Sequence, residues 1–161
     1  MTQPIRKNER EVKDLAEIAN IFDRCPVLRI AFVDRDYPYI VPVHYGYLLE
    51  SGCLTFYIHS AQEGRKIELA RRSPKIAFET DRLLGIGRSD KPCGWTSHYE
   101  SVFGEGLISF VRGEEKKKGI DLLMRRYGFT GPFSYDMAVF AKTEVMKIEP
   151  TSLSAKRNVQ K

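Results

Sequence analysis

The chain has 161 residues, of which 42% are hydrophobic and 29% are charged, so it can form one domain with a substantial core. Its net charge of +5 is small and its charges are interspersed, whereas nucleic-acid-binding proteins usually present a clustered basic face. No apolar run approaches the roughly 20 residues of a membrane span, and the N-terminus shows no signal segment. We therefore expect a cytoplasmic protein that binds neither nucleic acid nor membrane.

The cysteines point to the same compartment. Cys25, Cys53 and Cys93 are far apart, odd in number and without metal-ligand spacing. This usage is typical of a reducing environment, and no metal site is expected.

The first part of the chain alternates between helical and strand patterns. Apolar residues at helical spacing predict an amphipathic helix over residues 11–24, which Pro26 ends. Runs rich in β-branched and aromatic residues then predict strands over 27–33, 39–48 and 54–59. Short polar turns join these strands, which is the pattern of an antiparallel meander.

The second part continues with further elements of both kinds. We predict a helix after Ser60 that ends near residue 73, a strand over 75–80, a long loop over 82–97, a strand over 98–111, a helix over 113–127 and a last strand over 138–149. Six strands with mostly local connections predict a small antiparallel barrel rather than a parallel sheet. We expect a single domain over residues 1–161, with its core at about residues 10–150.

One stretch, from Tyr57 to Lys66, places an imidazole, a hydroxyl and two adjacent cations where a strand gives way to a helix. His59, Ser60 and Arg65 lie within it. A helix N-terminus with free N–H groups and fixed positive charges is suited to a phosphate. The stretch is therefore a candidate anion site.

The same stretch has a second interpretation that needs no ligand. Ser60 and Glu63 have the spacing of a capping box, which satisfies the first N–H groups of a helix. A cap leaves Gly64 unexplained, because glycine inside a helix costs about 1 kcal/mol relative to alanine. It also leaves two cations in a first turn where the helix dipole disfavours them. A bound anion would explain both features.

Individual residues allow both structural and functional interpretations. Pro42 lacks an N–H, which indicates an edge strand or a backbone surface left free for a flat ring. His59 is either a packed histidine or the one candidate catalytic residue, since its usual pKa suits proton transfer. For His44 we favour a core or cross-strand position. Trp95 is equally suited to stacking on a planar ligand and to anchoring an interface.

Four blocks of the sequence, in this order and spacing, resemble the pyridoxamine 5′-phosphate oxidase-like flavoproteins: residues 25–31, 38–45, 57–66 and 99–106. The similarity is greatest to their nitroimidazole-resistance (Nim-like) branch. It extends from about residue 10 to residue 149. The resemblance implies a mainly β (α+β) fold, namely a six-stranded antiparallel split β-barrel with flanking helices. It also implies a homodimer that binds FMN in a groove between its subunits.

The resemblance assigns roles to particular residues. The backbone of one strand would follow the isoalloxazine ring: Ile40, Val41, Pro42 and Val43. The strand-to-helix stretch would hold the phosphate through Ser60, Arg65 and Lys66, with Tyr57 and His59 also binding the cofactor. A third block, with Tyr99 and Ser101, would approach the cofactor from the partner chain. Residues 154–159 do not match the substrate-phosphate pocket of the long oxidases. Pyridoxamine phosphate oxidation is therefore not expected.

No nucleophile–base–acid arrangement occurs, which is typical of a redox protein whose cofactor supplies the chemistry. We predict an FMN-dependent reductase that passes electrons from a nicotinamide donor to a small planar acceptor such as a nitroaromatic compound. The run Gly85-Ile86-Gly87 lacks the third glycine of a dinucleotide fingerprint, so the donor would bind transiently on the flavin. The alternatives are a non-catalytic flavin-binding protein and a haem-binding member with a histidine ligand.

Overall fold

The computed structural model describes residues 7–159. Its strands are β1 (Glu11–Val12), β2 (Leu28–Phe32), β3 (Tyr39–Val43), β4 (Gly46–Glu50), β5 (Cys53–Ala61), β6 (Lys75–Gly87), β7 (Thr96–Val111) and β8 (Thr143–Asn158). Its helices are α1 (Leu15–Arg24), α2 (Arg65–Arg72), α3 (Gly113–Arg126) and α4 (Met137–Lys142), with short 3₁₀ turns η1 (Asn8–Arg10) and η2 (Pro92–Gly94).

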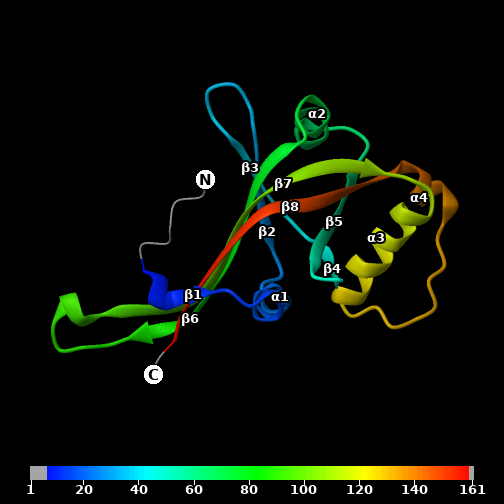
Figure 1. The fold of residues 1–161 in the computed structure, drawn as a ribbon. Coiled ribbons are helices and arrows are strands. Elements are labelled where there is room, and N and C mark those ends of the chain that lie inside the picture. Colours follow the sequence, from blue (N-terminus) through cyan, green and yellow to red (C-terminus); the bar gives the residue numbers. More distant parts are fainter. Residues whose placement is uncertain (1–6, 160–161) are drawn as a thin grey trace.

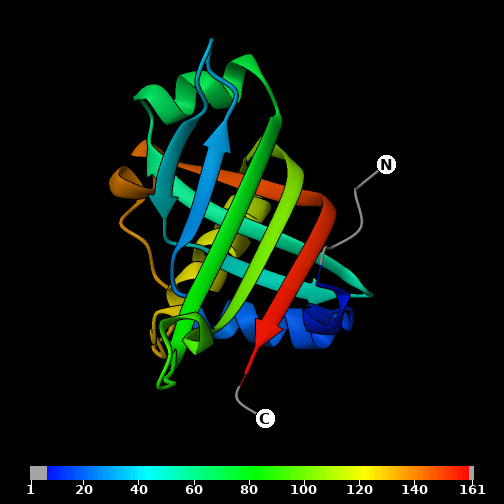
Figure 2. The same cartoon turned by 90° about the vertical axis from the view of Figure 1, so that its left-hand side faces the viewer.

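The strands form one antiparallel sheet in the order β3-β2-β6-β7-β8-β5-β4, and β1 pairs with β8. In Figure 2, β6, β7 and β8 cross in front of β4 and β5, with α3 behind them and α1 below. The two ends of the strand path, β3 and β4, are consecutive in the chain but do not pair. This open sheet confirms the predicted mainly β, split-barrel fold. It has eight strands where six were predicted.

The core lies between the curved sheet and α1. Asp14 caps α1 through a 2.8 Å bond from the Ala16 N–H, so the helix begins four residues later than predicted. The inward face of α1 places Phe22 against Phe56, with ring centroids 4.8 Å apart. Phe56 also contacts Phe78 of β6 at 5.4 Å. Burying each such ring contributes about 1.5–3 kcal/mol, which fixes the strands that carry the candidate site.

The predicted strand over residues 39–48 is two strands, which accounts for one of the two additional strands. The chain turns at His44 and Tyr45 because the Tyr45 side chain enters the core, where its hydroxyl lies 2.7 Å from the Cys25 carbonyl oxygen. Gly46 then passes so close to α3 that a Cβ there would lie 2.5 Å from the Leu123 nitrogen. β4 therefore leaves β3 and joins β5 at the other end of the sheet.

The capping box predicted from Ser60 and Glu63 is wrong. Ser60 is still part of β5, and the helix begins only at Arg65, with Gly64 as its N-cap. Gly64 has φ of 120°, a conformation that favours glycine. The glycine is therefore explained by the turn into α2 rather than by a ligand.

The predicted loop over residues 82–97 is largely paired structure. β6 and β7 extend past the body as a hairpin, with register pairs that run from Leu83–Tyr99 to Gly87–Thr96. In Figure 1 this arm points away from α2, α3 and α4. Its polar, glycine-rich sequence resembled a loop because the pairing depends on long-range register.

The prediction of a last strand over residues 138–149 is wrong for residues 138–142 and confirmed for residues 143–149. Residues 137–142 form α4, because the Asp136 carboxylate accepts hydrogen bonds from the Ala138 and Val139 N–H groups and caps a short helix. The strand that follows continues to Asn158, where it pairs with Tyr99 of β7. Regular structure therefore continues beyond residue 150.

Candidate functional site

Three basic side chains from separate elements approach one another where β5 leads into α2. His59 lies near the end of β5, Lys66 lies in the first turn of α2, and His44 follows β3. The pKa of His59 is lowered by partial burial and then by the positive charges of Lys66 and His44. We call His44, His59 and Lys66 the histidine–lysine cluster.

Lys66 stands out within this cluster. Burial lowers the pKa of its ammonium group, which shows that the charge is partly removed from water. Among residues 7–159, no carboxylate lies within ion-pair distance of it. The hydrogen bonds of α2 begin only with the Ile67 N–H, 2.9 Å from the Gly64 carbonyl oxygen, so the first N–H groups of the helix remain available nearby. A partly desolvated ammonium group beside free N–H groups favours the binding of an anion.

The neighbouring Arg65 is in a different state. Its guanidinium donates to Asp34 at 2.6 Å, and Arg72 donates to the other oxygen of the same carboxylate at 2.8 Å. Arg65 also lies over the Tyr39 ring, 4.7 Å from its centroid. The hydrogen bonds from Arg72 and Arg65 lower the pKa of Asp34. We call Asp34, Arg65 and Arg72 the ion-pair cluster, in which Arg65 already has a carboxylate partner.

Tyr57 and Ser60 lie near His59 in β5, Tyr57 on the same face of the strand and Ser60 on the opposite face. Tyr57 is buried against α3, with its hydroxyl 3.4 Å from Glu115. Ser60 points to the opposite face of the strand from His59, because successive strand residues alternate. Of the β5 residues predicted to bind the cofactor, His59 is the one whose side chain lies in the cluster.

The predicted ring-binding strand, β3, lies at the edge of the sheet and has a strand partner only in β2. Its backbone is therefore unpaired along its other edge, and His44 follows directly at its end. Ile40 and Pro42 are exposed on its outer face, whereas Val41 and Val43 point inward. This position agrees with the edge-strand interpretation of Pro42 and leaves the backbone accessible.

Tyr99 and Ser101 are not brought to the cluster within one chain. They lie on β7, which β2 and β6 separate from β3. Three strand spacings amount to about 14 Å from β3, and Ser101 lies ten residues, or about 33 Å, along β7 from Val111, which is level with His59 through Val145. Strand pairing does place Ser101 on the outer face of the sheet, the face that also carries Pro42. A second molecule that covers this face could therefore bring the two sets together.

His44 is the cluster residue whose place the sequence did not indicate. It is exposed rather than in the core, and its ring stacks on Tyr127 with centroids 4.7 Å apart. Tyr127 is held in turn by a 2.6 Å hydrogen bond from its hydroxyl to the Pro26 carbonyl oxygen. Tyr127 lies 83 positions along the chain from His44, so no local pattern could have paired them.

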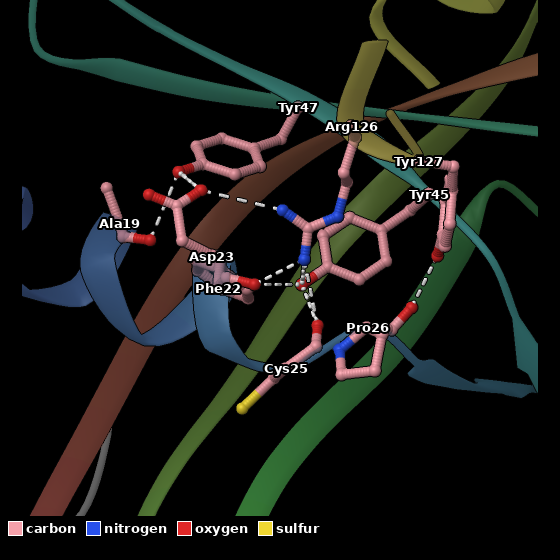
Figure 3. Close-up of polar contacts among 9 residues, drawn as sticks. All are labelled: Ala19, Phe22, Asp23, Cys25, Pro26, Tyr45, Tyr47, Arg126 and Tyr127. Carbon is pink, nitrogen blue, oxygen red and sulfur yellow. Dashed lines mark hydrogen bonds and ion pairs between the residues drawn. The ribbon is translucent and has the colours of Figure 1, made fainter. Parts of the chain in front are cut away.

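The arginine before Tyr127 fixes this arrangement, as Figure 3 shows. Arg126 donates to the carbonyl oxygens of Phe22 and Cys25 at the C-terminal end of α1. Its guanidinium also lies over the Tyr45 ring, 4.3 Å from the centroid. The end of α3 is thereby tied to the end of α1, and the ring beneath His44 is held in place.

The described residues exclude two other kinds of site. Within residues 7–159, no group of three or more histidine, cysteine, aspartate or glutamate side chains could hold a metal ion. No helix in the same part of the chain has the length and apolar character needed to cross a membrane.

Comparison with solved structures shows which proteins share this fold. A candidate 5-nitroimidazole antibiotic resistance protein from Bacteroides thetaiotaomicron is 27% identical, with a TM-score of 0.76 over 91% of this chain and 85% of that one. A candidate pyridoxamine 5′-phosphate oxidase from Listeria innocua is 26% identical, with a TM-score of 0.54 over 86% and 94%. The FAD and haem binding protein of Mycobacterium smegmatis shares the fold, with a TM-score of 0.81, 17% identity and coverage of 94% and 74%.

Comparison with curated proteins gives no match. The family model described as pyridoxamine 5′-phosphate oxidase matches residues 14–157, nearly the whole chain. This match agrees with the split barrel and with the order of the four sequence blocks. The chain therefore belongs to the pyridoxamine 5′-phosphate oxidase family.

Proposed function

We propose that this protein is a flavin-dependent oxidoreductase that binds FMN, with the phosphate held by the histidine–lysine cluster. The observation that carries the proposal is Lys66, a partly desolvated cation with no carboxylate partner among residues 7–159, beside the start of a helix. In a member of this family, an anionic cofactor group is the natural counter-charge. The cluster offers one compact phosphate site, which suits FMN better than FAD.

The residues of the cluster divide the work of holding the phosphate. Lys66 supplies a charge-assisted hydrogen bond, and the first N–H groups of α2 add the positive end of the helix. His59 can donate from its ring, and His44 adds positive potential when it is protonated. The free edge of β3, including Val41, offers backbone groups to the polar rim of a flat ring. The flavin, when bound, supplies the electron transfer.

We further propose that the working form is a homodimer with the cofactor at the interface. The outer face of the sheet exposes large apolar side chains: Ile40 is 60% exposed, Phe103 50% and Leu107 44%. Strand pairing places all three on the face that carries Ser101. A two-fold contact through this face would bury them and bring Tyr99 and Ser101 of one copy toward the site of the other.

The redox partners follow from the same site. The described residues offer one compact phosphate site, so we propose that a nicotinamide donor binds transiently against the flavin. A small planar acceptor such as a nitroaromatic compound could take its place afterwards. The 27% identity to a candidate 5-nitroimidazole resistance protein supports this class of acceptor. Because the flavin does the chemistry, His59 would act as a proton donor or as a cofactor-lining group.

The test begins with the absorption spectrum of the purified protein after FMN is added and excess is removed. We expect a flavin spectrum, FMN rather than FAD on mass spectrometry of the released cofactor, and a dimer by light scattering. Reduction by NAD(P)H, followed by reoxidation with a nitroaromatic compound, should then occur with turnover. Bound flavin without turnover would indicate a carrier, and a haem spectrum without flavin would overturn the proposal.

A further inference from the structure

A cavity of about 410 Å³ is lined at one end by His59. The ends of β5 and β8 form its base, α3 forms one wall, and residues 134–140 form the other. Figure 1 shows α3 and α4 together at the end of the molecule opposite the β6–β7 arm. Its volume is at the lower end of the roughly 300–1,000 Å³ of ligand pockets, which suits a small molecule.

The walls of this cavity are mainly apolar and adaptable. They are contributed by α3, α4 and β8: Ile120, Leu123, Met124, Val139, Phe140 and Val145. Methionine adjusts to ligands of varied shape and makes favourable contacts with aromatic rings. Phe140 adds an aromatic surface, and its ring packs against Tyr135 with centroids 5.2 Å apart. Such a lining favours an aromatic ligand.

Most polar groups around the cavity are already occupied. The Tyr135 hydroxyl is hydrogen-bonded to Asp121, and the Asp136 carboxylate caps α4. The Thr143 hydroxyl donates to the Val139 carbonyl oxygen at 3.0 Å. These groups help to shape the walls, while the second oxygen of the Asp136 carboxylate and the Ser134 hydroxyl have no hydrogen-bond partner among residues 7–159.

His59 is the ionisable group at the β5 end of the cavity. Among residues 7–159 it has no hydrogen-bond partner, and it lines the cavity from the end of β5. Its lowered pKa keeps the ring neutral near pH 7, so one nitrogen can donate and the other can accept. The charges that face it are Lys66 of α2 and His44 after β3, with Asp136 across the cavity.

We propose that this cavity binds a small neutral aromatic molecule of one or two rings, whose polar group hydrogen-bonds to His59. The mainly apolar lining disfavours a charged ligand, because a charge placed among apolar side chains would lose its hydration. The cavity stands independently of the flavin proposal. His59 would link the cavity to the FMN phosphate site, and this link rests on the proposed function.

The test uses 2-naphthol as the probe and naphthalene as the matched probe without a hydroxyl group. Binding to the full chain is measured by fluorescence titration, with and without added FMN. We expect saturable binding of both probes, with 2-naphthol tighter by roughly five- to tenfold, as one hydrogen bond predicts. His59→Phe should remove this difference and leave naphthalene binding nearly unchanged. Equal affinity of the two probes for the unaltered protein would overturn the proposal.

Two variants on the same helix locate the site. Val139→Trp enlarges a side chain that lines the cavity at its exposed rim, and it should weaken both probes at least tenfold. Met137→Trp is the control, because Met137 is 69% exposed and does not line the cavity. It should bind both probes as the unaltered protein does. Equal loss in the two variants, or no loss in Val139→Trp, would contradict the proposed location.

A third variant separates this inference from the proposed function. Lys66→Met should weaken FMN while it leaves naphthalene binding unchanged, because Lys66 does not line the cavity. If FMN fails to bind the unaltered protein and both probes still bind in the expected pattern, the flavin proposal fails and the cavity stands. If FMN binds and neither probe does, the cavity proposal fails and the flavin proposal stands.

Discussion

Two adjacent cations, Arg65 and Lys66, begin the same helix and have opposite surroundings. Arg65 shares the carboxylate of Asp34 with Arg72, at 2.6 and 2.8 Å. Lys66 has no such partner among residues 7–159 and is partly desolvated beside His59. The ion-pair cluster is thus complete without a ligand, whereas the histidine–lysine cluster lacks a negative charge. Neighbours in sequence can therefore serve structure and binding separately.

The largest effect is expected from Lys66→Met, on the affinity for FMN. Removal of its charge-assisted hydrogen bond should weaken FMN by roughly tenfold to a hundredfold. The free energy of unfolding should not fall, because an unpaired and partly buried charge is removed. Titration of FMN by flavin fluorescence, with thermal melts alongside, measures both quantities. A stability loss with unchanged FMN affinity would place Lys66 with the structural cations.

The next effect concerns the proton on His59. Burial, Lys66 and His44 lower its pKa in the free protein, and a bound phosphate should raise it again. FMN binding should then take up a proton, so its affinity should rise a few-fold as pH falls through the bound-state pKa. The rise should level off below the free-state pKa. Calorimetry in buffers of different ionisation enthalpy measures this uptake.

His59→Phe is the control for that experiment, because FMN phosphate itself gains a proton near pH 6. The proton uptake that remains in His59→Phe belongs to the phosphate. Equal uptake in the variant and the unaltered protein would show that His59 does not face the phosphate.

A smaller effect is expected for Arg65→Met. Because Arg65 already pairs with Asp34 and is largely exposed to solvent, FMN affinity should change less than about threefold. The melting temperature should fall instead, since Asp34 loses one of its two partners. The same titration and melts measure both. A loss of FMN affinity as large as that of Lys66→Met would remove the distinction between the two clusters.

The smallest effect is expected on the stability of the folded protein at acidic pH, through Asp34. The pKa of Asp34 is below its unfolded value of about 3.9, so its contribution is present above that pH and is lost as pH falls through the folded-state pKa. Asp34→Asn should therefore melt earlier at neutral pH and lose less stability on acidification. Thermal melts between neutral and acidic pH test this. Asp90→Asn, on the exposed arm, should behave as the unaltered protein.

Much of the fold could be predicted because its signals are local. The alternation in β2 and the apolar spacing of α1 indicate both their type and their inward faces. The Asp136 cap of α4 was also a local signal, but the β-branched and aromatic residues after it favoured a strand. The pairing that extends β6 beyond residue 80 depends on β7, and no local pattern reports it.

The candidate site was predicted in composition but not in arrangement. The sequence showed Arg65 and Lys66 as equivalent cations, because the partner of Arg65 lies 31 residues earlier, at Asp34. It could not show that Tyr127 would hold His44 beside His59. These contacts join residues that are far apart in the sequence. Only the three-dimensional structure therefore distinguishes the ion-pair cluster from the histidine–lysine cluster.

The most direct test of the central claim compares FMN with riboflavin, which lacks the phosphate. If Lys66 holds the phosphate, the unaltered protein and Arg65→Met should both prefer FMN by at least tenfold. Lys66→Met should bind the two flavins with nearly equal affinity. A full preference for FMN in Lys66→Met, or its loss in Arg65→Met alone, would contradict the assignment of the phosphate to the histidine–lysine cluster.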